Sequence, residues 1–177
     1  MHNGNFRDAQ PVLILLVGLP GSGKTTFAQA LAARLPVEHI ESDAVRLRLT
    51  PNPGYSMFES AAVFAQVDAA ARQALTCGRH ALIDATNLTN RDRRRFHRIA
   101  EQLEIRLVVV RLTAPERVNR QRLSEPRAGL SQAGVAVFEG MRGRLQPLAV
   151  ASVVVDSRFL FGPAIDLVLR VIDDREL

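Results

Sequence analysis

The chain has 177 residues, of which 47% are hydrophobic and 23% charged, and its formal net charge is +5. This composition is typical of a soluble globular protein of one domain and excludes an intrinsically disordered chain. The single cysteine, Cys77, excludes an internal disulfide framework, and no apolar run approaches the ~18 residues of a membrane span. We therefore expect a cytoplasmic protein without a signal peptide, with a loose N-terminal tail over residues 1 to about 10 and one domain over residues 11–177.

The first predicted elements surround an unusual lysine. Residues 12–17 are continuously aliphatic, which is typical of a central strand buried on both faces. Residues 18–25, GLPGSGKT, match the pattern G-x-x-x-x-G-K-[ST], and apolar residues then recur at helical spacing. Lys24 in this motif is the only lysine among 23 basic residues, which indicates a site that needs a compact ammonium group. Strand, glycine loop and helix together predict a P-loop for a nucleoside triphosphate.

The P-loop pattern assigns roles to its residues. Gly21 and Gly23 allow positive φ, so that backbone N–H groups can face phosphate oxygens. Lys24 is expected to reach the β- and γ-phosphates, and the Thr25 hydroxyl to bind Mg²⁺. The residues expected around the nucleotide are Gly18, Pro20, Gly21, Ser22, Gly23, Lys24, Thr25 and Thr26. Because there is no second lysine, the chain lacks a guanine-reading Asn-Lys-x-Asp motif, which leaves the small phosphotransferases as the favoured class.

Strands and helices are predicted to alternate along the rest of the chain. Further strands are expected at residues 37–42, 79–85, 105–112 and 151–156. Helices are expected from about residue 43 and over residues 56–77, 90–103, 115–123, 131–145 and 163–172. Five strands joined by helical crossovers predict a parallel α/β sheet with helices on both faces, as in nucleoside-monophosphate kinases. Ligands in such sheets bind at the carboxyl ends of the strands.

Two acidic residues lie at or just after the ends of strands, at that expected binding edge. Asp43 and, one helical turn later, Arg46 fit a carboxylate that deprotonates an acceptor hydroxyl and a cation near the transferring phosphate. The alternative is a helix N-cap at Ser42 or Asp43 with Arg46 as a surface partner, and spacing does not separate the two. Asp84 is the second acid, and its place next to the P-loop strand predicts a carboxylate in the shell of the Mg²⁺ ion.

The segment after Asp84 carries polar and basic side chains. Thr86 and Asn87 are expected in the cleft, whereas residues 89–92 read as a capping box. Four arginines of the following helix form one stripe opposite an apolar stripe: Arg91, Arg94, Arg95 and Arg98. This stripe is either a solvated face or a surface along which an anionic substrate binds, with Arg91 the candidate substrate contact. Between residues 79 and 144, fourteen arginines stand against seven acidic residues, and this net charge of +7 favours a polyanionic partner.

A second group of arginines is expected in a mobile lid at about residues 114–130. It contains Arg117, Arg120, Arg122 and Arg127, and breaks at Pro126 and Gly129. Arginines in such a lid stabilise the charge that spreads over a transferring phosphoryl group. The alternative is a helix with scattered surface arginines.

With these pieces assembled, the chain resembles the polynucleotide kinase-like family of small P-loop kinases. The matching pieces are GLPGSGKTT, SDAVR, IDATNLTNRDRR and RVNRQRLSEPR. The resemblance implies an ATP-dependent kinase with Mg²⁺, in which Asp43 is the general base and Arg46 contacts the acceptor-side phosphate or the transferring group. It further implies that Asp84 supports the metal and acceptor site and that a lid arginine, Arg120 or Arg122, stabilises the transferring phosphoryl. Arg117 is a candidate contact for ATP.

The leading prediction for the acceptor is a 5′-hydroxyl nucleic acid end, and the alternative is a small molecule. The arginine stripe favours a 5′-hydroxyl nucleic acid end, whereas the scarcity of aromatic residues that could stack a base favours a small alcohol such as a sugar, an antibiotic or a metabolite. A third alternative is a non-catalytic nucleotide-binding switch in which Asp43 is only a helix cap. No protein partner is evident from the sequence.

Overall fold

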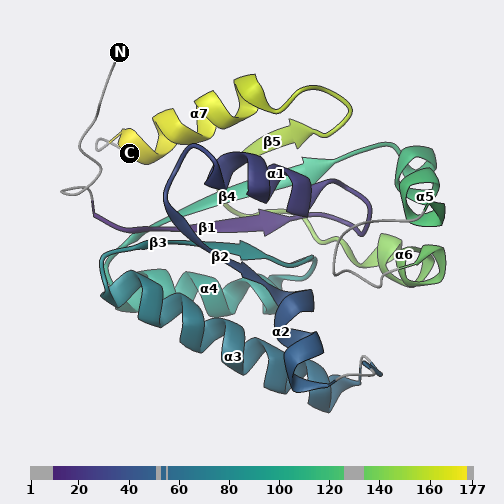
Figure 1. The fold of residues 1–177 in the computed structure, drawn as a ribbon, viewed down its shortest axis with the longest axis horizontal. Coiled ribbons are helices and arrows are strands. Elements are labelled where there is room, and N and C mark those ends of the chain that lie inside the picture. The colour runs from purple at the N-terminus through teal and green to yellow at the C-terminus, as the bar shows by residue number, and fades with distance from the viewer. Residues whose placement is uncertain (1–9, 51–52, 55, 126–133, 175–177) are drawn as a thin grey trace.

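The computed structural model describes residues 10–50, 53–54, 56–125 and 134–174. Its centre is one parallel sheet of five strands in the order β2-β3-β1-β4-β5 (Figure 1). The strands are β1 (Val12–Val17), β2 (Val37–Glu41), β3 (His80–Asp84), β4 (Arg106–Thr113) and β5 (Ser152–Asp156). The predicted α/β fold with five parallel strands is therefore confirmed, and so is the position of β3 beside the P-loop strand.

Seven helices connect and cover these strands within the described part of the chain. They are α1 (Lys24–Ala32), α2 (Ser42–Leu49), α3 (Met57–Thr76), α4 (Asn90–Gln102), α5 (Glu116–Ser124), α6 (Val135–Met141) and α7 (Gly162–Asp173). A short 3₁₀ turn, Arg142–Arg144, follows α6. The sequence placed the α3 and α4 boundaries within one residue. The tail and part of the predicted lid, including Pro126, Arg127 and Gly129, lie outside the described residues.

The two faces of the sheet have separate cores because side chains alternate along each strand. In β1, Leu13, Leu15 and Val17 pack toward α3 and α4, whereas its other side chains pack toward α1 and α7. Every residue of β1 is buried, as expected for a central strand covered on both faces. Figure 1 shows α1 and α7 above the sheet and α3 and α4 below it.

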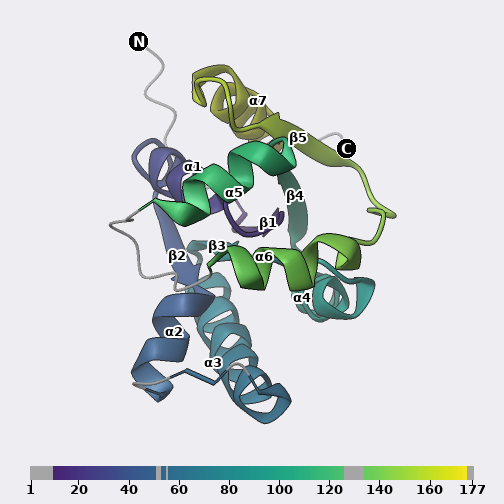
Figure 2. The same cartoon turned by 90° about the vertical axis from the view of Figure 1, so that its right-hand side faces the viewer.

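The carboxyl ends of the strands gather at one end of the molecule. Figure 2 looks onto this end, where α5 and α6 lie in front of the sheet and α2 and the start of α3 lie below. Helix α4 begins there with the predicted capping box, in which the Thr89 hydroxyl accepts from the Asp92 N–H at 3.2 Å and Asp92 accepts from the Thr89 N–H at 3.0 Å. None of the helices in the described ranges has the length and apolar character needed to cross a membrane.

Candidate active site

The P-loop has the backbone conformation that its glycines predict. Gly21 and Gly23 have φ values of 78° and 87°, in the left-handed region that favours glycine. A Cβ atom on Gly21 would lie 2.8 Å from the carbonyl oxygen of Asn119 in α5, so the loop also needs glycine for space. The Ser22 hydroxyl is buried without a hydrogen-bond partner in the described structure. A loop of this shape fits an anionic phosphate chain.

A cavity of about 690 Å³ opens beside the P-loop at the carboxyl edge of the sheet. Its volume lies within the roughly 300–1,000 Å³ usual for small-ligand sites. Among the site residues predicted from the sequence, the cavity is lined by Pro20, Gly21, Gly23, Lys24, Thr25, Thr26, Asp43, Arg46, Asp84, Thr86, Asn87 and Arg122. Gly18 and Ser22 are buried behind the loop, and Arg91, Arg117 and Arg120 are not among the lining residues.

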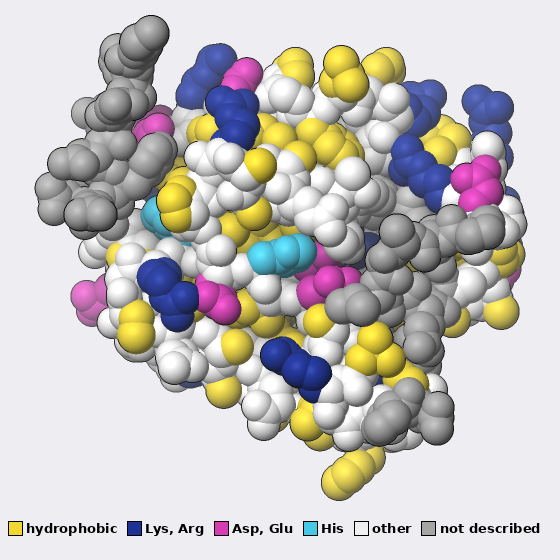
Figure 3. Space-filling view, in the orientation of Figure 1, with side chains coloured by type: hydrophobic (Ala, Val, Ile, Leu, Met, Phe, Trp, Pro, Cys, Tyr) yellow, Lys and Arg dark blue, Asp and Glu magenta, His cyan; other side chains and the backbone are white. Residues whose placement is uncertain are grey.

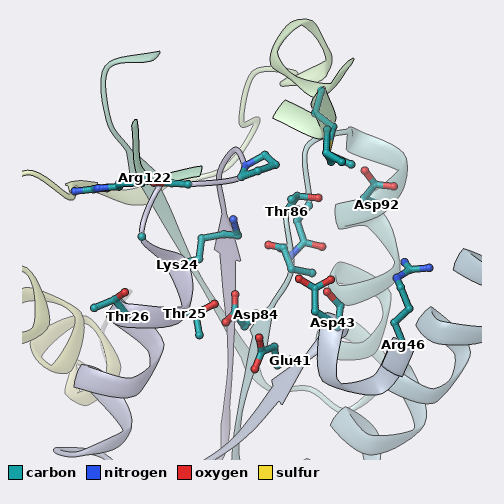
Figure 4. Close-up of a pocket in the computed structure, with 18 of the residues that line it drawn as sticks. Lys24, Thr25, Thr26, Glu41, Asp43, Arg46, Asp84, Thr86, Asp92 and Arg122 are labelled. Atoms are coloured by element: carbon teal, nitrogen blue, oxygen red, sulfur yellow. Dashed lines mark hydrogen bonds between the residues drawn. The ribbon is translucent and has the colours of Figure 1, made fainter. Parts of the chain in front are cut away.

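Lys24, Asp43 and Asp84 converge on the floor of this cavity (Figure 4). The Lys24 ammonium donates to the carbonyl oxygen of Leu19 at 3.1 Å. Burial lowers the pKa of Lys24, and the charges of Asp84 and then Asp43 oppose that effect. Both carboxylates are therefore close enough to Lys24 to act on its charge.

Asp43 is not the cap of its helix. The N-cap position of α2 is Glu41, and Asp43 lies inside the first turn of the helix. Among the described residues, no hydrogen bond or ion pair engages its side chain. The alternative prediction, with Ser42 or Asp43 as the N-cap, is therefore wrong. The Asp43 carboxylate lines the cavity and is not needed to hold the described structure together.

Asp84 is held by a residue that the sequence did not single out. Its Oδ2 lies 3.3 Å from Nε2 of His39, and Asp84 itself is 3% exposed. This hydrogen bond raises the pKa of His39. Glu41, directly opposite Asp84 in the register of β2 and β3, also lines the cavity, and its pKa is raised by burial and by the charge of Asp84.

The oxygen donors on the floor fit a Mg²⁺ ion bound together with a nucleotide. The Thr25 hydroxyl and the Asp84 carboxylate supply the hard oxygen ligands that this ion prefers. In the part of the chain that the structure describes, no group of three or more His, Cys, Asp or Glu side chains could hold a metal by itself. This fits Mg²⁺, which is commonly bound by one or two protein groups plus substrate phosphates.

Arg46 is buried, 7% exposed, and its Nη1 donates to Oε1 of Glu59 in α3 at 2.5 Å. It lines the cavity, yet it also ties α2 to α3. Arg46 is therefore placed near the predicted acceptor side, but part of its charge is compensated by Glu59.

The two catalytic candidates in the predicted lid occupy different surroundings. Arg120 bonds Glu139 at 2.6 Å and Glu116 at 3.1 Å and lies outside the cavity lining. Arg122 donates to the carbonyl oxygen of Gly21 at 3.2 Å and to the side chain and backbone oxygens of Ser157 at 2.7 and 2.8 Å. Arg122 thus links α5, the P-loop and the segment after β5, on the far side of the P-loop from Asp43 (Figure 4).

We expect Arg122→Ala to weaken ATP binding by about tenfold or more, because hydrogen bonds to a charged group contribute roughly 1.5–3 kcal/mol and this group also holds the P-loop. Arg122→Lys should restore part of the affinity. Titration of ATP by calorimetry measures the effect, with the exposed Arg94→Ala as the control. An unchanged affinity in Arg122→Ala would contradict a role at the nucleotide.

Asn87 and Arg93 stabilise the loop between β3 and α4. Asn87 has a positive φ of 48°, is buried, and donates from its side-chain amide to the Leu16 carbonyl at 2.7 Å. Its own carbonyl accepts from Arg93 at 3.0 Å. Thr86 lines the cavity, and its carbonyl accepts from the Gly18 N–H at 3.0 Å, joining this loop to the P-loop. The amide nitrogen of Asn87, which was predicted to contact substrate, is thus engaged with the backbone, whereas its side-chain oxygen is buried without a hydrogen-bond partner among the described residues.

The fold and the site together define a P-loop nucleotide-binding domain with the architecture of small kinases. The model of an AAA domain family matches residues 13–148, and the chain belongs to this family. A search of curated protein sequences found no significant match.

Several solved structures are similar in fold. An APS kinase CysC of Mycobacterium tuberculosis, solved with AMPPNP and APS, is 17% identical, has a TM-score of 0.73, and aligns over 94% of this chain and 99% of its own. A gluconokinase of Sinorhizobium meliloti 1021 is 18% identical, with a TM-score of 0.67 and 93% of each chain covered. A chain of the Pnkp1/Rnl/Hen1 RNA repair complex is 23% identical, with a TM-score of 0.65, but only 47% of its length is covered, by 82% of this chain. At these identities the likeness concerns the fold.

Proposed function

We propose that this protein transfers the γ-phosphoryl group of ATP to a hydroxyl group of an acceptor. The observation that carries the proposal is the carboxylate of Asp43, which faces the same cavity as Lys24 and has no structural partner among the described residues. A non-catalytic nucleotide switch, the third alternative, does not require a carboxylate in that position.

In the proposed reaction, Lys24 and the P-loop amides hold the β- and γ-phosphates. Asp43 accepts the proton of the acceptor hydroxyl as its oxygen attacks the γ-phosphorus. A new oxygen–phosphorus bond forms, the bond between the γ-phosphorus and the bridging oxygen breaks, and ADP leaves with that oxygen. Mg²⁺, held on the side of Thr25 and Asp84, would neutralise phosphate charge.

The acceptor that the cavity favours is a small alcohol. Its described lining contains four basic residues against five acidic ones, so that it is not a basic channel. On the face drawn in Figure 3, basic side chains form no continuous band. Strong binding of a nucleic acid backbone depends on several cations placed along its path.

The arginine stripe of α4 gives this view further support. None of its four members is in the cavity lining. Arg95 lies 4.4 Å over the Phe64 ring and 3.9 Å from Asp68, so that it packs α4 against α3. Arg91, Arg94 and Arg98 are exposed to solvent. A 5′-hydroxyl nucleic acid end, the leading acceptor predicted from the sequence, becomes the second candidate, favoured by these three exposed arginines.

The test is transfer of labelled γ-phosphate from ATP, with Mg²⁺, to a panel of small alcohols and to a 5′-hydroxyl oligonucleotide. We expect label on a small alcohol and its loss in Lys24→Ala, because the variant lacks the ammonium that holds the phosphates. Label on the oligonucleotide alone, with a steep dependence on salt, would overturn the choice of acceptor. ATP binding without label on any acceptor would overturn phosphotransfer itself.

A further inference from the structure

One wall of the cavity comes from a segment to which the sequence assigned no function. Val137 and Met141 of α6 and Arg144 of the following 3₁₀ turn line the cavity. They are four and three residues apart, which places them along one face of the helix and its continuation. Ser60 and Phe64 of α3, a helix that Figure 2 shows apart from α6, also line the cavity.

The opposite face of the same segment is fixed to α5 by an ionic cluster. Glu139 pairs with Arg120 at 2.6 Å and with Arg142 at 3.1 Å, and Glu116 of α5 pairs with the same two arginines at 3.1 and 3.2 Å. Phe138, which is fully buried, lies beneath Arg120 with 5.4 Å between the guanidinium carbon and the ring centre. Single exposed ion pairs add little stability, but these four pairs share their partners in one network, which connects this side of α6 to α5.

The four basic side chains that line the cavity differ in whether they are bonded to another residue. Lys24 belongs to the P-loop, Arg46 bonds Glu59, and Arg122 bonds Ser157. Arg144 has no hydrogen bond or ion pair with another residue in the described ranges, although it lines the same cavity. A guanidinium so placed can accept a carboxylate or a phosphate in a two-pronged contact.

The remaining groups of this subsite are apolar. Phe64 of α3 and Val137 and Met141 of α6 offer contact to a hydrophobic body. The Phe64 ring is itself held by Arg95. Asp92, the acid of α4 in the lining, caps its own helix by accepting from the Thr89 N–H, so its charge is partly compensated by that helix terminus.

We propose that this wall selects the acceptor: a small alcohol with an apolar body that lies between Phe64 and Met141 and an anionic group, carboxylate or phosphate, that pairs with Arg144. That the ligand is a phosphoryl acceptor rests on the proposed function. The chemical groups of the ligand are inferred from the residues of this wall. The anionic end would face Arg144 while the hydroxyl end faces Asp43.

The test uses three probes that share a benzylic hydroxyl and differ in one group: 4-(hydroxymethyl)benzoate, 4-(hydroxymethyl)phenyl phosphate and the neutral 4-(hydroxymethyl)benzamide. Binding to the protein loaded with AMPPNP and Mg²⁺ is measured by calorimetry, and ADP release with ATP is measured in parallel. We expect an anionic probe to bind about tenfold more tightly than the amide, as one charge-assisted contact allows. The stronger of the two anions identifies the group.

Arg144→Gln should abolish the preference for the anion, and Arg144→Lys should restore part of it. Arg98→Gln is the matched control, because it removes an equal charge from an exposed position outside the cavity lining. Equal binding of amide and anions, no binding of any probe, or a preference that survives Arg144→Gln would overturn the inference. An Arg144-dependent preference without ADP release would leave the subsite standing and count against phosphotransfer. ADP release without a preference for the anionic probes would support phosphotransfer and overturn the proposed subsite.

Discussion

Asp43→Asn is expected to lower the turnover of phosphoryl transfer by about a hundredfold to ten-thousandfold, the usual contribution of a positioned general base. Asparagine has nearly the same shape but cannot accept the proton of the acceptor hydroxyl. ATP affinity should change little, because the P-loop and Lys24 stay in place. Steady-state kinetics with ATP and an alcohol acceptor, together with ATP titration, measure both quantities.

The fold should tolerate this change. Asp43 engages no partner among the described residues, and loss of one acid from the first turn of α2 costs about 0.3–1 kcal/mol. Asp166→Asn is the control, since Asp166 pairs with Arg34 on the surface at 2.6 Å. Turnover within twofold of the wild type in Asp43→Asn would contradict a base role for this residue.

Arg93→Ala is expected to have the largest effect on stability. Arg93 is 3% exposed, and its guanidinium donates to the backbone carbonyls of Asn87, Leu88, Gln146 and Pro147 and to the side chain of Asn90, at 2.6–3.2 Å. Alanine would leave the buried carbonyl of Asn87 unpaired and would remove the bonds to the other acceptors, which together costs about 3 kcal/mol or more. For a chain of this size, that corresponds to a fall in melting temperature of about 6–12 °C.

Thermal and urea unfolding followed by circular dichroism measure this loss. Arg94→Ala is the matched control, because the neighbouring Arg94 is exposed and its loss should change stability by less than about 0.5 kcal/mol. Arg93→Lys should be intermediate, which keeps the test informative if the alanine variant does not fold. A melting temperature of Arg93→Ala within about 2 °C of the wild type would show that these bonds contribute little.

The sequence predicted the fold well because each element carried a local signal. The continuous aliphatic run of β1 and the glycine pattern after it required a buried strand and a P-loop, and the positive φ values of Gly21 and Gly23 agree. Alternation of strands and helices then implied the parallel sheet and its ligand-binding edge. Asp43 and Asp84 were found because Asp84 ends one strand at that edge and Asp43 closely follows another.

The partners of the arginines were not predictable in this way. Helical periodicity identified a stripe on α4, yet the buried arginine is Arg93, outside that stripe, because its acceptors include a segment more than fifty residues away. Arg120 and Arg122 look equivalent in the sequence. Because they are two residues apart in α5, their side chains leave nearly opposite sides of the helix, and Arg120 pairs with Glu139 whereas Arg122 bonds Ser157. Long-range contacts of this kind have no local signature.

The cavity residues missed from the sequence have the same explanation. Glu41 reaches the site because β2 pairs with β3 in a register that sets it opposite Asp84. Arg144 reaches it through the orientation of α6, which depends on ion pairs with α5. The alternation of β2 could have indicated that His39 and Glu41 share a face, but not which neighbour they meet.

The most direct test of the account is a crystal structure of the protein with AMPPNP and Mg²⁺. We predict the β- and γ-phosphates on Lys24, the Thr25 hydroxyl bound to Mg²⁺ at about 2.1 Å, and the γ-phosphate turned toward Asp43 and the space between α3 and α6. A γ-phosphate that points away from Asp43, with that space closed by side chains, would contradict the proposed transfer to a hydroxyl at this site.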